Sequence, residues 1–511
     1  MGLIASTLQN LSINKEGEDI WDQAVQFAIP TGMTLFDVLN ANFERDRNRN
    51  YTILNGGFQA KAYTLLGESS TGKSTLAIQW AAACVDFVNS IYPGVSDLVF
   101  FDIEKYFHYE RIKQITGWTD KDVFEKLVLY HNEKTNIVDV FNEIKKICDL
   151  KEQKRKEVTI TTPIYNLTGL PHHELAPTFV IIDSIAMLTR VPEFEHKKTG
   201  ELYEEESMGQ NTEAMRDALE NTKFIKKVKP LLSKYNIILL MVNHITNDVV
   251  MSRYENPKKY LPFLKPGQKV VGGKELIYQS ASIMEIVGGE RLHGDKLKYG
   301  PEIHGSINKL TFKKNKNGFE GIDYPIVLSA AMGYMYELSD FELITEEKYG
   351  ISGIGSYQLS ILPEAGNIKK SNCYEKCQEN PLLARAIQFT AKTYLIYTMV
   401  YRKDPPDLEA LVEGMSYDDR IKMILAYTTS YPKYRHLDDR LLAENINSLR
   451  KSNYPFKKNV QNFFGSLAES IVDYYNKGYL YDPDMKVSFK DSLDEKKIIK
   501  DKKGKCYLNT K

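Results

Sequence analysis

The segment from Gly67 to Ser74, GESSTGKS, constrains the fold of this chain more than any other feature, because it fits the pattern G-x-x-x-x-G-K-[ST]. An apolar run at residues 63–66 precedes it, and a helical pattern begins at Thr75. A strand, a glycine-rich loop and a helix in this order are the context that a phosphate-binding loop requires. The glycines let backbone N–H groups point inward, and the helix N-terminus adds positive potential. The alternative is a chance match in a Gly/Ser loop, which the agreement of strand, loop and helix disfavours.

The chemistry of this loop predicts ATP and Mg²⁺ as cofactors. Lys73 can reach the β- and γ-phosphates, and the Ser74 hydroxyl is a candidate Mg²⁺ ligand. A second candidate metal ligand is Asp183, which ends the apolar run FVIID. The residues expected to bind the nucleotide and its metal are Gly67, Glu68, Ser69, Ser70, Thr71, Gly72, Lys73, Ser74, Thr75 and Asp183.

Apolar runs alternate with helical patterns beyond this loop, which predicts a mainly parallel twisted sheet covered by helices. The runs expected to form these strands are residues 63–66, 98–101, 127–130, 178–182 and 237–242. Helical patterns cover residues 21–28, 34–43, 75–88 and 138–148. Three later runs, at residues 283–287, 309–313 and 324–328, are expected to close one side of the sheet.

Beyond residue 332 the strand patterns fade, and helical patterns follow at residues 382–401 and 460–476. The expected fold class is therefore α/β, with a small N-terminal segment and a helical C-terminal domain. The expected parts are an N-terminal oligomerisation segment at 1–50, an α/β core at 51–335, a mainly helical domain at 336–484 and a basic tail at 485–511. The tail is expected to be a solvated end, with contact to nucleic acid as the alternative.

Polar side chains follow three of the expected strands. Glu104 and Asp183 each come after an apolar run, and the pair Asn243-His244 follows another. Since ligands of open α/β sheets bind at the carboxyl ends of the strands, these groups are candidate site residues. Glu104 could orient or deprotonate an attacking water, and His244 could contact a γ-phosphate. The alternatives are a surface acid at a strand end and a structural histidine.

Composition excludes several classes of protein. The chain has 67 Lys and Arg against 67 Asp and Glu, so total charge does not indicate a nucleic-acid partner, which a local basic surface could still bind. Five cysteines in 511 residues give no disulfide framework, which favours a cytoplasmic location. No apolar run approaches the ~18 residues of a membrane span, so no membrane partner is expected.

The motifs GESSTGKST, VFFDIEK, FVIIDSIAMLT and IILLMVNHI occur in this order along the chain. Together they resemble the ATPase core of RecA-type recombinases, and Asn243-His244 is similar to the phage UvsX branch. The resemblance covers about residues 29–333. It implies that Glu104 is the catalytic carboxylate, that Asp183 is the Walker-B acid, and that His244 couples the γ-phosphate to a DNA-binding segment. An aromatic that stacks on adenine is expected between Tyr106 and Arg111.

The resemblance also implies two DNA-binding loops, at about residues 190–211 and 247–273. The second is basic with interleaved aromatics, as binding to stretched DNA requires; the alternative is a flexible basic lid. The first contains an acidic stretch at Glu201–Glu206, and its contact with phosphate stays open. The expected DNA-binding residues are Arg253, Lys258, Lys259, Lys265, Lys269, Gly272 and Gly273.

A basic segment near residue 314 resembles the family's Lys-Asn-Lys motif, whose lysines reach the ATP of the neighbouring subunit. Lys314 and Lys316 are therefore candidate catalytic cations that act in trans. A cation supplied in this way contributes ~10³–10⁵-fold to phosphoryl transfer. Without the resemblance, an exposed basic turn after a strand is the simpler interpretation.

The resemblance implies a DNA-dependent ATPase that forms filaments on single-stranded DNA and catalyses homologous pairing and strand exchange with double-stranded DNA. Expected partners are further copies of the chain, a mediator and a single-strand-binding protein, in a bacterial host cytoplasm if the chain is phage-encoded. One alternative is a hexameric helicase with a RecA-type fold, although the phosphate loop begins as early as Gly67 and lysines stand where an arginine finger is expected. Another is a DNA-binding scaffold that keeps ATP only as a structural ligand, which the presence of both Glu104 and Asp183 disfavours.

Overall fold

The structure is a computed structural model. It describes residues 26–41, 43–45, 51–53, 56–131, 135–165, 171–188, 210–247, 259–270, 274–293, 297–316, 320, 322–360, 362–400, 432, 498–500 and 506–508.

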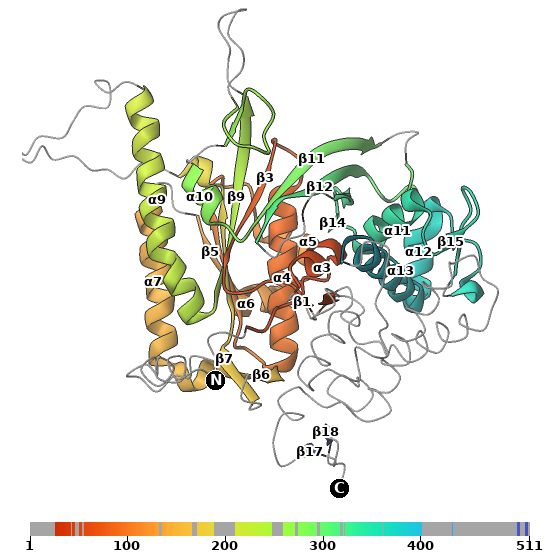
Figure 1. Cartoon of the computed structure of the whole chain (residues 1–511), viewed down its shortest axis with the longest axis horizontal. Coiled ribbons are helices and arrows are strands. Elements are labelled where there is room, and N and C mark those ends of the chain that lie inside the picture. The colour runs from red at the N-terminus through yellow and green to blue at the C-terminus, as the bar shows by residue number, and fades with distance from the viewer. Residues whose placement is uncertain are drawn as a thin grey trace, which may run out of the picture.

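A mixed sheet lies at the centre of the described structure (Figure 1). Its strands are β3 (Ala62–Gly67), β4 (Asp97–Asp102), β5 (Leu127–Tyr130), β8 (Thr178–Asp183), β9 (Ile237–Asn247), β10 (Gln268–Val270), β11 (Ser282–Leu292), β12 (Gly305–Asn315), β13 (Asp323–Ser329) and β14 (Gly333–Tyr334). The strand order is β14-β13-β12-β11-β3-β9-β8-β4-β5, and β10 pairs with β9 outside this path. The strands from β11 to β5 in that order are parallel, whereas β10, β12, β13 and β14 pair in antiparallel fashion.

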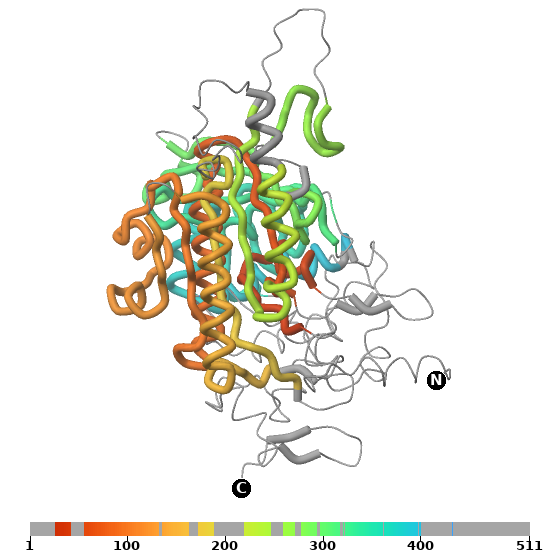
Figure 2. Tube along the Cα trace, turned by 90° about the vertical axis from the view of Figure 1, so that its left-hand side faces the viewer, coloured from red at the N-terminus to blue at the C-terminus, as the bar shows by residue number. Residues whose placement is uncertain are grey.

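Helices cover both faces of the sheet. The face with α4 (Lys73–Ile91) also carries α3 (Thr34–Leu39), α5 (Tyr109–Thr116) and α6 (Asp120–Lys126). The opposite face carries α7 (Ile137–Gln153), α9 (Gln210–Tyr235) and α10 (Lys274–Gln279), and Figures 1 and 2 both show α7 and α9 side by side. Because side chains alternate along a strand, Phe100 enters the core on the α4 side and Phe101 enters the core on the α7 side.

Three helices follow the sheet in the chain: α11 (Tyr336–Glu347), α12 (Cys373–Glu379) and α13 (Pro381–Leu395). They pack at the β12–β14 side, where α13 contacts α3 and α11 contacts β13. A buried carboxylate joins these parts, since Asp340 accepts hydrogen bonds from Thr34 Oγ1 at 2.5 Å and from Tyr324 Oη at 2.7 Å. One hydrophobic cluster runs from Phe27 through the sheet to Ile396. The helices after residue 335 thus share a core with the sheet.

Shorter elements complete the described chain. Two-stranded pairs are β1 (Phe43–Arg45) with β2 (Tyr51–Ile53), β6 (Thr159–Tyr165) with β7 (Pro171–Leu175), β15 (Ile351–Ser352) with β16 (Gln358–Leu359), and β17 (Ile498–Lys500) with β18 (Cys506–Leu508). Helix α8 spans Arg155–Val158, 3₁₀ turns span Ile185–Met187, Pro363–Ala365 and Lys370–Asn372, and a π-helical turn spans Ile396–Val400. In the described part of the chain, no helix combines the length and apolarity needed to cross a membrane.

The α/β class and the mainly parallel sheet expected from the sequence are confirmed, as are the eight expected strands. Three differences stand out. Residues 26–28 are not helical, the expected helix at 34–43 ends at Leu39, and β9 runs to Asn247 rather than ending at Val242. The hairpin β6–β7 was not expected. The helical pattern at 460–476 and most of the tail at 485–511 lie outside the described residues, and the domain boundaries stay predictions.

Candidate active site

The loop between β3 and α4 requires glycine at its second conserved position. Gly67 ends β3, level with His244 in β9 and with Ile286 in β11. Gly72 is the N-cap of α4 and has φ of +87°, in the left-handed region that glycine favours. A Cβ atom at Gly72 would lie 2.4 Å from Leu328 Cδ1. Backbone conformation therefore selects glycine at this position, and a β-carbon would in addition displace the end of the Leu328 side chain.

Side chains inside and behind the loop hold its shape. Thr71 Oγ1 donates to the Glu68 carbonyl at 3.0 Å, and Lys73 Nζ donates to the same carbonyl at 2.6 Å. From β12, Asn308 Nδ2 donates to the Thr71 carbonyl at 2.9 Å, while its Oδ1 accepts from Gly289 N at 3.1 Å. Asn308 is buried. These hydrogen bonds connect parts of the loop to one another and connect the loop to strand β12.

The ammonium group of Lys73 is held in a buried place near three carboxylates. Burial lowers its pKa, and the charges of Asp183, Glu104 and Glu68 oppose that shift. Only 4 % of Lys73 is exposed, so a ligand that replaced the Glu68 carbonyl would not have to remove a full hydration shell from the ammonium group. A buried ammonium group of this kind is suited to charge-assisted hydrogen bonds with phosphate oxygens.

Asp183 lies at the carboxyl end of β8 with only 2 % of its surface exposed. Burial raises its pKa to about 7; the Ser74 side chain, which hydrogen-bonds to it, lowers that pKa, and the charges of Glu104 and Asp102 raise it. Within the described residues, the Asp183 Oδ1 atom has no hydrogen-bond partner. A buried carboxylate with a vacant oxygen beside a serine hydroxyl fits Mg²⁺, which takes one or two protein oxygens together with phosphate oxygens.

Glu104 follows β4 and receives two hydrogen bonds on a single oxygen. Ser184 Oγ donates to Glu104 Oε1 at 2.6 Å, and His244 Nε2 lies 2.8 Å from the same atom. Burial raises the pKa of Glu104, but the hydrogen bonds from Ser184 and His244 and the charge of Lys73 outweigh it, so the net pKa is below its usual value. The carboxylate is therefore ionised, and within the described part of the chain no group hydrogen-bonds to its other oxygen, Oε2.

Strand β9 brings His244 to this edge of the sheet. His244 lies inside the strand, because β9 continues beyond it and pairs with β10 through Ile245, Thr246 and Asn247. The sequence placed His244 after the end of its strand. Because the strand is longer than predicted, the residue that contacts Glu104 and the residues that pair with β10 belong to one continuous strand.

Lys314 and Lys316 lie closer to the amino ends of the parallel strands than the glycine-rich loop does. Lys314 pairs with Ile283 near the beginning of β11, whereas Gly67 pairs with Ile286 further along the same strand. The two lysines bind carbonyl groups at the end of α10. Within one chain, then, neither lysine joins the group formed by Lys73, Glu104 and Asp183.

Three of the expected DNA-binding lysines are described, and all three are exposed. Lys259 and Lys265 precede β10, and Lys269 lies within it. The remaining expected residues, Arg253, Lys258, Gly272 and Gly273, lie outside the described residues, as does the first expected loop up to residue 209. Helix α9 begins at Gln210, inside the range expected for that first loop.

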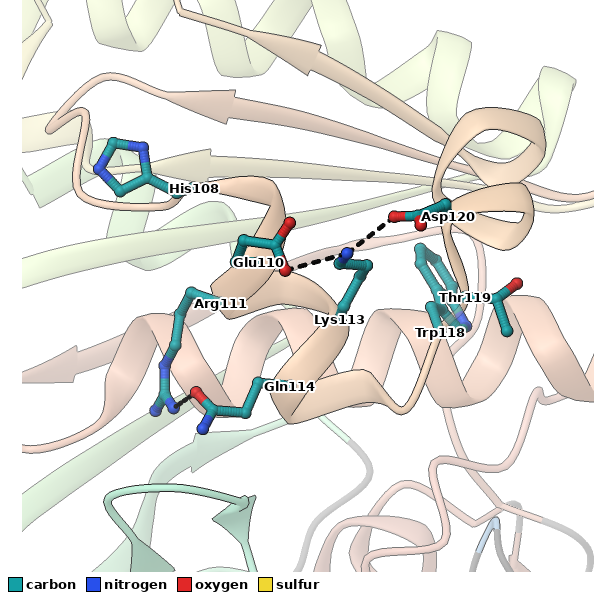
Figure 3. Close-up of a pocket in the computed structure, with 8 residues that line it drawn as sticks. All are labelled: His108, Glu110, Arg111, Lys113, Gln114, Trp118, Thr119 and Asp120. Carbon is teal, nitrogen blue, oxygen red and sulfur yellow. Dashed lines mark hydrogen bonds and ion pairs between the residues drawn. The ribbon is translucent and has the colours of Figure 1, made fainter.

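A shallow charged pocket lies over α5 and the loop to α6 (Figure 3). Its volume is about 850 Å³. Lys113 Nζ pairs with Glu110 at 2.9 Å and with Asp120 at 2.7 Å, and Arg111 donates to the Ala331 carbonyl at 2.9 Å. The pocket overlaps the stretch in which a base-stacking aromatic is expected. Its lining residues are His108, Glu110, Arg111, Lys113, Gln114, Trp118, Thr119 and Asp120.

Two residues of the site, Ser184 and Asn308, were not predicted from the sequence. Ser184 directly follows Asp183, and nothing in the local pattern indicates that it donates to Glu104. Asn308 carried a usable signal, since it occupies the inward-facing register of Leu310 and Phe312 in β12. A polar residue in an apolar register indicates a specific hydrogen-bond partner inside the protein.

The fold and the site define an α/β protein with a mostly parallel mixed sheet whose acidic and basic side chains meet at the carboxyl edge. Comparison of the chain with protein-family models and with curated proteins gives no match.

Proposed function

We propose that this protein is a DNA-dependent ATPase that acts as a recombinase, forming filaments on single-stranded DNA and exchanging strands with a homologous duplex. The observation that carries the proposal is the meeting of Lys73, Asp183, Glu104 and His244 at one sheet edge beside a glycine-rich loop. The order of the four motifs along the chain, which resembles the RecA-type core, supplies the DNA-related part.

In the proposed reaction the phosphate loop holds the triphosphate of ATP between α4 and the ends of β3, β8 and β9. Lys73 exchanges the Glu68 carbonyl for phosphate oxygens, and Ser74 and Asp183 hold Mg²⁺. When bound, the metal ion neutralises charge on the phosphate oxygens. Glu104 Oε2 accepts a proton from the attacking water, while Ser184 and His244 keep its carboxylate oriented.

In this proposal, strand β9 couples the nucleotide site to DNA. His244 contacts Glu104, and from the next residue, Ile245, the same strand pairs with β10. Exposed Lys269 lies in β10, and exposed Lys265 precedes it. These lysines are suited to DNA phosphates. A γ-phosphate that attracts His244 would shift the strand and the hairpin together, so that nucleotide state controls DNA contact.

The first experiment measures ATP hydrolysis by the purified protein with and without single-stranded DNA, with electron microscopy of the same samples. Strong stimulation together with helical filaments supports the recombinase. Discrete six-membered rings that move along DNA favour the hexameric helicase instead. Hydrolysis without any DNA effect leaves an ATPase and contradicts the DNA-related part.

Variants sharpen the assignment of the site. Glu104→Gln should lower hydrolysis ~10²–10⁴-fold while ATP binding and filaments persist, because only the proton acceptor is lost. Lys73→Ala should abolish ATP binding itself. Glu125→Gln is the matched control, since Glu125 is an exposed acid on α6 whose nearest ion-pair partner, Lys121, is 3.8 Å away. Equal activity of Glu104→Gln and Glu125→Gln would contradict the role of Glu104.

A further inference from the structure

The second half of α9 is basic on its outward side. Between Asn221 and Tyr235 the chain has five lysines and no aspartate or glutamate. All five are exposed, and they are Lys223, Lys226, Lys227, Lys229 and Lys234. The apolar residues at positions 224, 225, 228 and 232 instead enter the core beneath the helix. Figure 2 looks onto the layer that α9 forms with α7.

Four of these lysines share one side of the helix with two apolar residues. At 3.6 residues per turn, positions 219, 223, 226, 227, 230 and 234 fall on the same side. Leu219 is 53 % exposed, and Pro230 is exposed as well. Lys229 lies to one side of this group and donates to Gln279 Oε1 of α10 at 3.1 Å. We call the following residues the α9 face: Leu219, Lys223, Lys226, Lys227, Pro230 and Lys234.

The α9 face carries more positive charge than its ion pairs balance. Within the described part of the chain, one carboxylate pairs with it, since Glu220 lies 2.6 Å from Lys223 Nζ. Lys227 and Lys234 instead lie over aromatic rings, with Nζ 5.9 and 5.4 Å from the ring centroids. No described carboxylate forms an ion pair with Lys226. Four ammonium groups against one carboxylate leave a net charge of about +3.

The stability of the helix does not account for this charge. A helix dipole stabilises cations near the carboxyl end, but the effect fades within the last turn, which contains Lys234. Lys226 has Lys223 and Lys229 three residues away on either side, and Lys227 has Lys223 four residues away. Like charges at these spacings destabilise a helix. The positions of Lys226 and Lys227 therefore point to a partner of opposite charge outside the helix.

Duplex DNA fits the α9 face poorly. Packed helices lie about 8–10 Å apart and the grooves of a duplex are about 6 and 12 Å wide, so a duplex along α9 would also cover α7. Apart from buried Lys151, α7 has four acids against two lysines, a net charge of −2. These acids would repel the second strand of the duplex. A single extended chain is narrower and can follow α9 alone.

Pro230 adds a feature that favours a peptide over a nucleic-acid strand. Proline has no N–H group, so inside the helix it cannot donate to the Lys226 carbonyl four residues earlier. A peptide backbone can donate an N–H group to that carbonyl, whereas phosphate oxygens only accept hydrogen bonds. Exposed Leu219 also offers an aliphatic contact that a phosphate backbone does not use. Cations, a carbonyl acceptor and an aliphatic side chain together suit an acidic peptide that contains an apolar residue.

We propose that the α9 face is a docking surface for an acidic peptide segment of a partner protein. Glutamate or aspartate side chains of the partner pair with Lys223, Lys226 and Lys227, and an aliphatic side chain packs on Leu219. The inference goes beyond the proposed function and does not depend on it. The glycine-rich loop continues into α4 on the other face of the sheet, so a peptide on α9 leaves that loop open.

The first test measures fluorescence anisotropy of a labelled peptide of glutamate residues that carries one leucine near its end. Wild-type protein should bind this peptide. The Lys226→Gln/Lys227→Gln variant should bind it about tenfold more weakly, because it loses two exposed ion pairs that each contribute a few-fold. The Lys145→Gln/Lys146→Gln variant is the matched control, since it removes two adjacent exposed lysines from α7. Absence of binding, or equal weakening in both variants, would overturn the proposal.

The same variants decide between possible occupants of the α9 face. Labelled single-stranded DNA should bind wild-type protein and the Lys226→Gln/Lys227→Gln variant equally. Weaker DNA binding by this variant, with unchanged peptide binding, would assign the face to nucleic acid and overturn the proposal. Sedimentation should give both proteins the same assembly state. A smaller assembly of the variant, again with unchanged peptide binding, would assign the face to a second copy of the chain and overturn the proposal too.

A leucine variant tests the apolar part of the face. Leu219→Gln should weaken binding of the leucine-containing peptide but not of a peptide of glutamates alone. Leu150→Gln is its matched control, because Leu150 is a leucine of α7 with 55 % exposure, close to that of Leu219. This variant should change neither affinity. If Leu219→Gln binds both peptides as wild type does, the partner makes no apolar contact there and the proposed peptide chemistry is wrong.

Discussion

Asn308 is the residue whose replacement tests the architecture of the glycine-rich loop between β3 and α4 most directly. Its amide joins the Thr71 carbonyl in the loop to Gly289 N on β11. Asn308→Ala removes both hydrogen bonds. Gly289 is exposed, so water can satisfy its N–H group, whereas Thr71 is only 5 % exposed. The free-energy cost of Asn308→Ala therefore arises mainly from the Thr71 carbonyl, which loses its hydrogen-bond donor.

A buried carbonyl left without a donor costs about 1–3 kcal/mol. If this free energy destabilises the loop conformation that is proposed to bind phosphate, the Kd for ATP should rise roughly 5- to 150-fold. Asn308→Asp should weaken binding at least as much, because it keeps the acceptor for Gly289 N but turns a second oxygen toward the Thr71 carbonyl. The assays are ATP binding by calorimetry and the free energy of unfolding by urea denaturation.

The control for Asn308 is Thr311→Val, on the same strand. Thr311 is buried and donates to Asp323 at 2.6 Å, away from the loop. This variant should lose a comparable amount of stability, about 1 kcal/mol, with an unchanged Kd for ATP. If Asn308→Ala also leaves the Kd unchanged, the hydrogen bond to Thr71 does not shape the loop, and the reasoning is refuted.

Two further predictions concern backbone strain and pH. Gly72→Ala should destabilise the protein more than Gly94→Ala, and urea denaturation measures the difference. Both glycines have positive φ, a conformation that costs alanine about 1–2 kcal/mol. Only at Gly72 would the added β-carbon also contact Leu328. Equal costs would show that Leu328 yields without strain. Burial lowers the pKa of Lys151 to about 7. Between pH 7 and the usual pKa of lysine, the unfolded chain therefore binds more protons than the folded protein does. Stability rises with pH by about 1.4 kcal/mol per unit in that window, and the Lys151→Met variant should lack this slope. An identical pH dependence in that variant would contradict the shifted pKa.

The parallel part of the sheet could be predicted from the sequence because its strands are buried on both faces. Such strands appear as short continuous apolar runs, as in residues 98–101 and 178–182. Strand β9 was predicted too short because its last five residues are mostly polar. Asn243 and His244 pair with β3, and Ile245–Asn247 pair with β10, more than twenty residues later. Local patterns carry no information on such partners.

The hairpin β6–β7 was missed for a related reason. Its strands contain Pro163 and begin with Pro171, which argue against strands in a sheet interior. A two-stranded hairpin leaves one edge of each strand unpaired, so a proline is tolerated there. At the site, Asp183 and Glu104 could be placed by their position after apolar runs. The partners of the donors Ser184 and Asn308 could not be predicted, because they lie 80 and 237 residues away, although the apolar register of Asn308 indicated a buried polar residue.

The separation of the glycine-rich loop from Lys314 and Lys316 has a consequence for symmetry. If one edge of each subunit gives its nucleotide to the other edge of the next, every contact joins two different surfaces, which excludes a two-fold dimer as the working unit. Such head-to-tail association produces either a closed ring or an open helix with two unlike ends. In an open helix, the terminal subunit whose nucleotide meets no lysines of a neighbouring subunit would hydrolyse ATP slowly. Average hydrolysis per subunit would then increase with the length of the assembly, and the two ends would lose subunits at different rates.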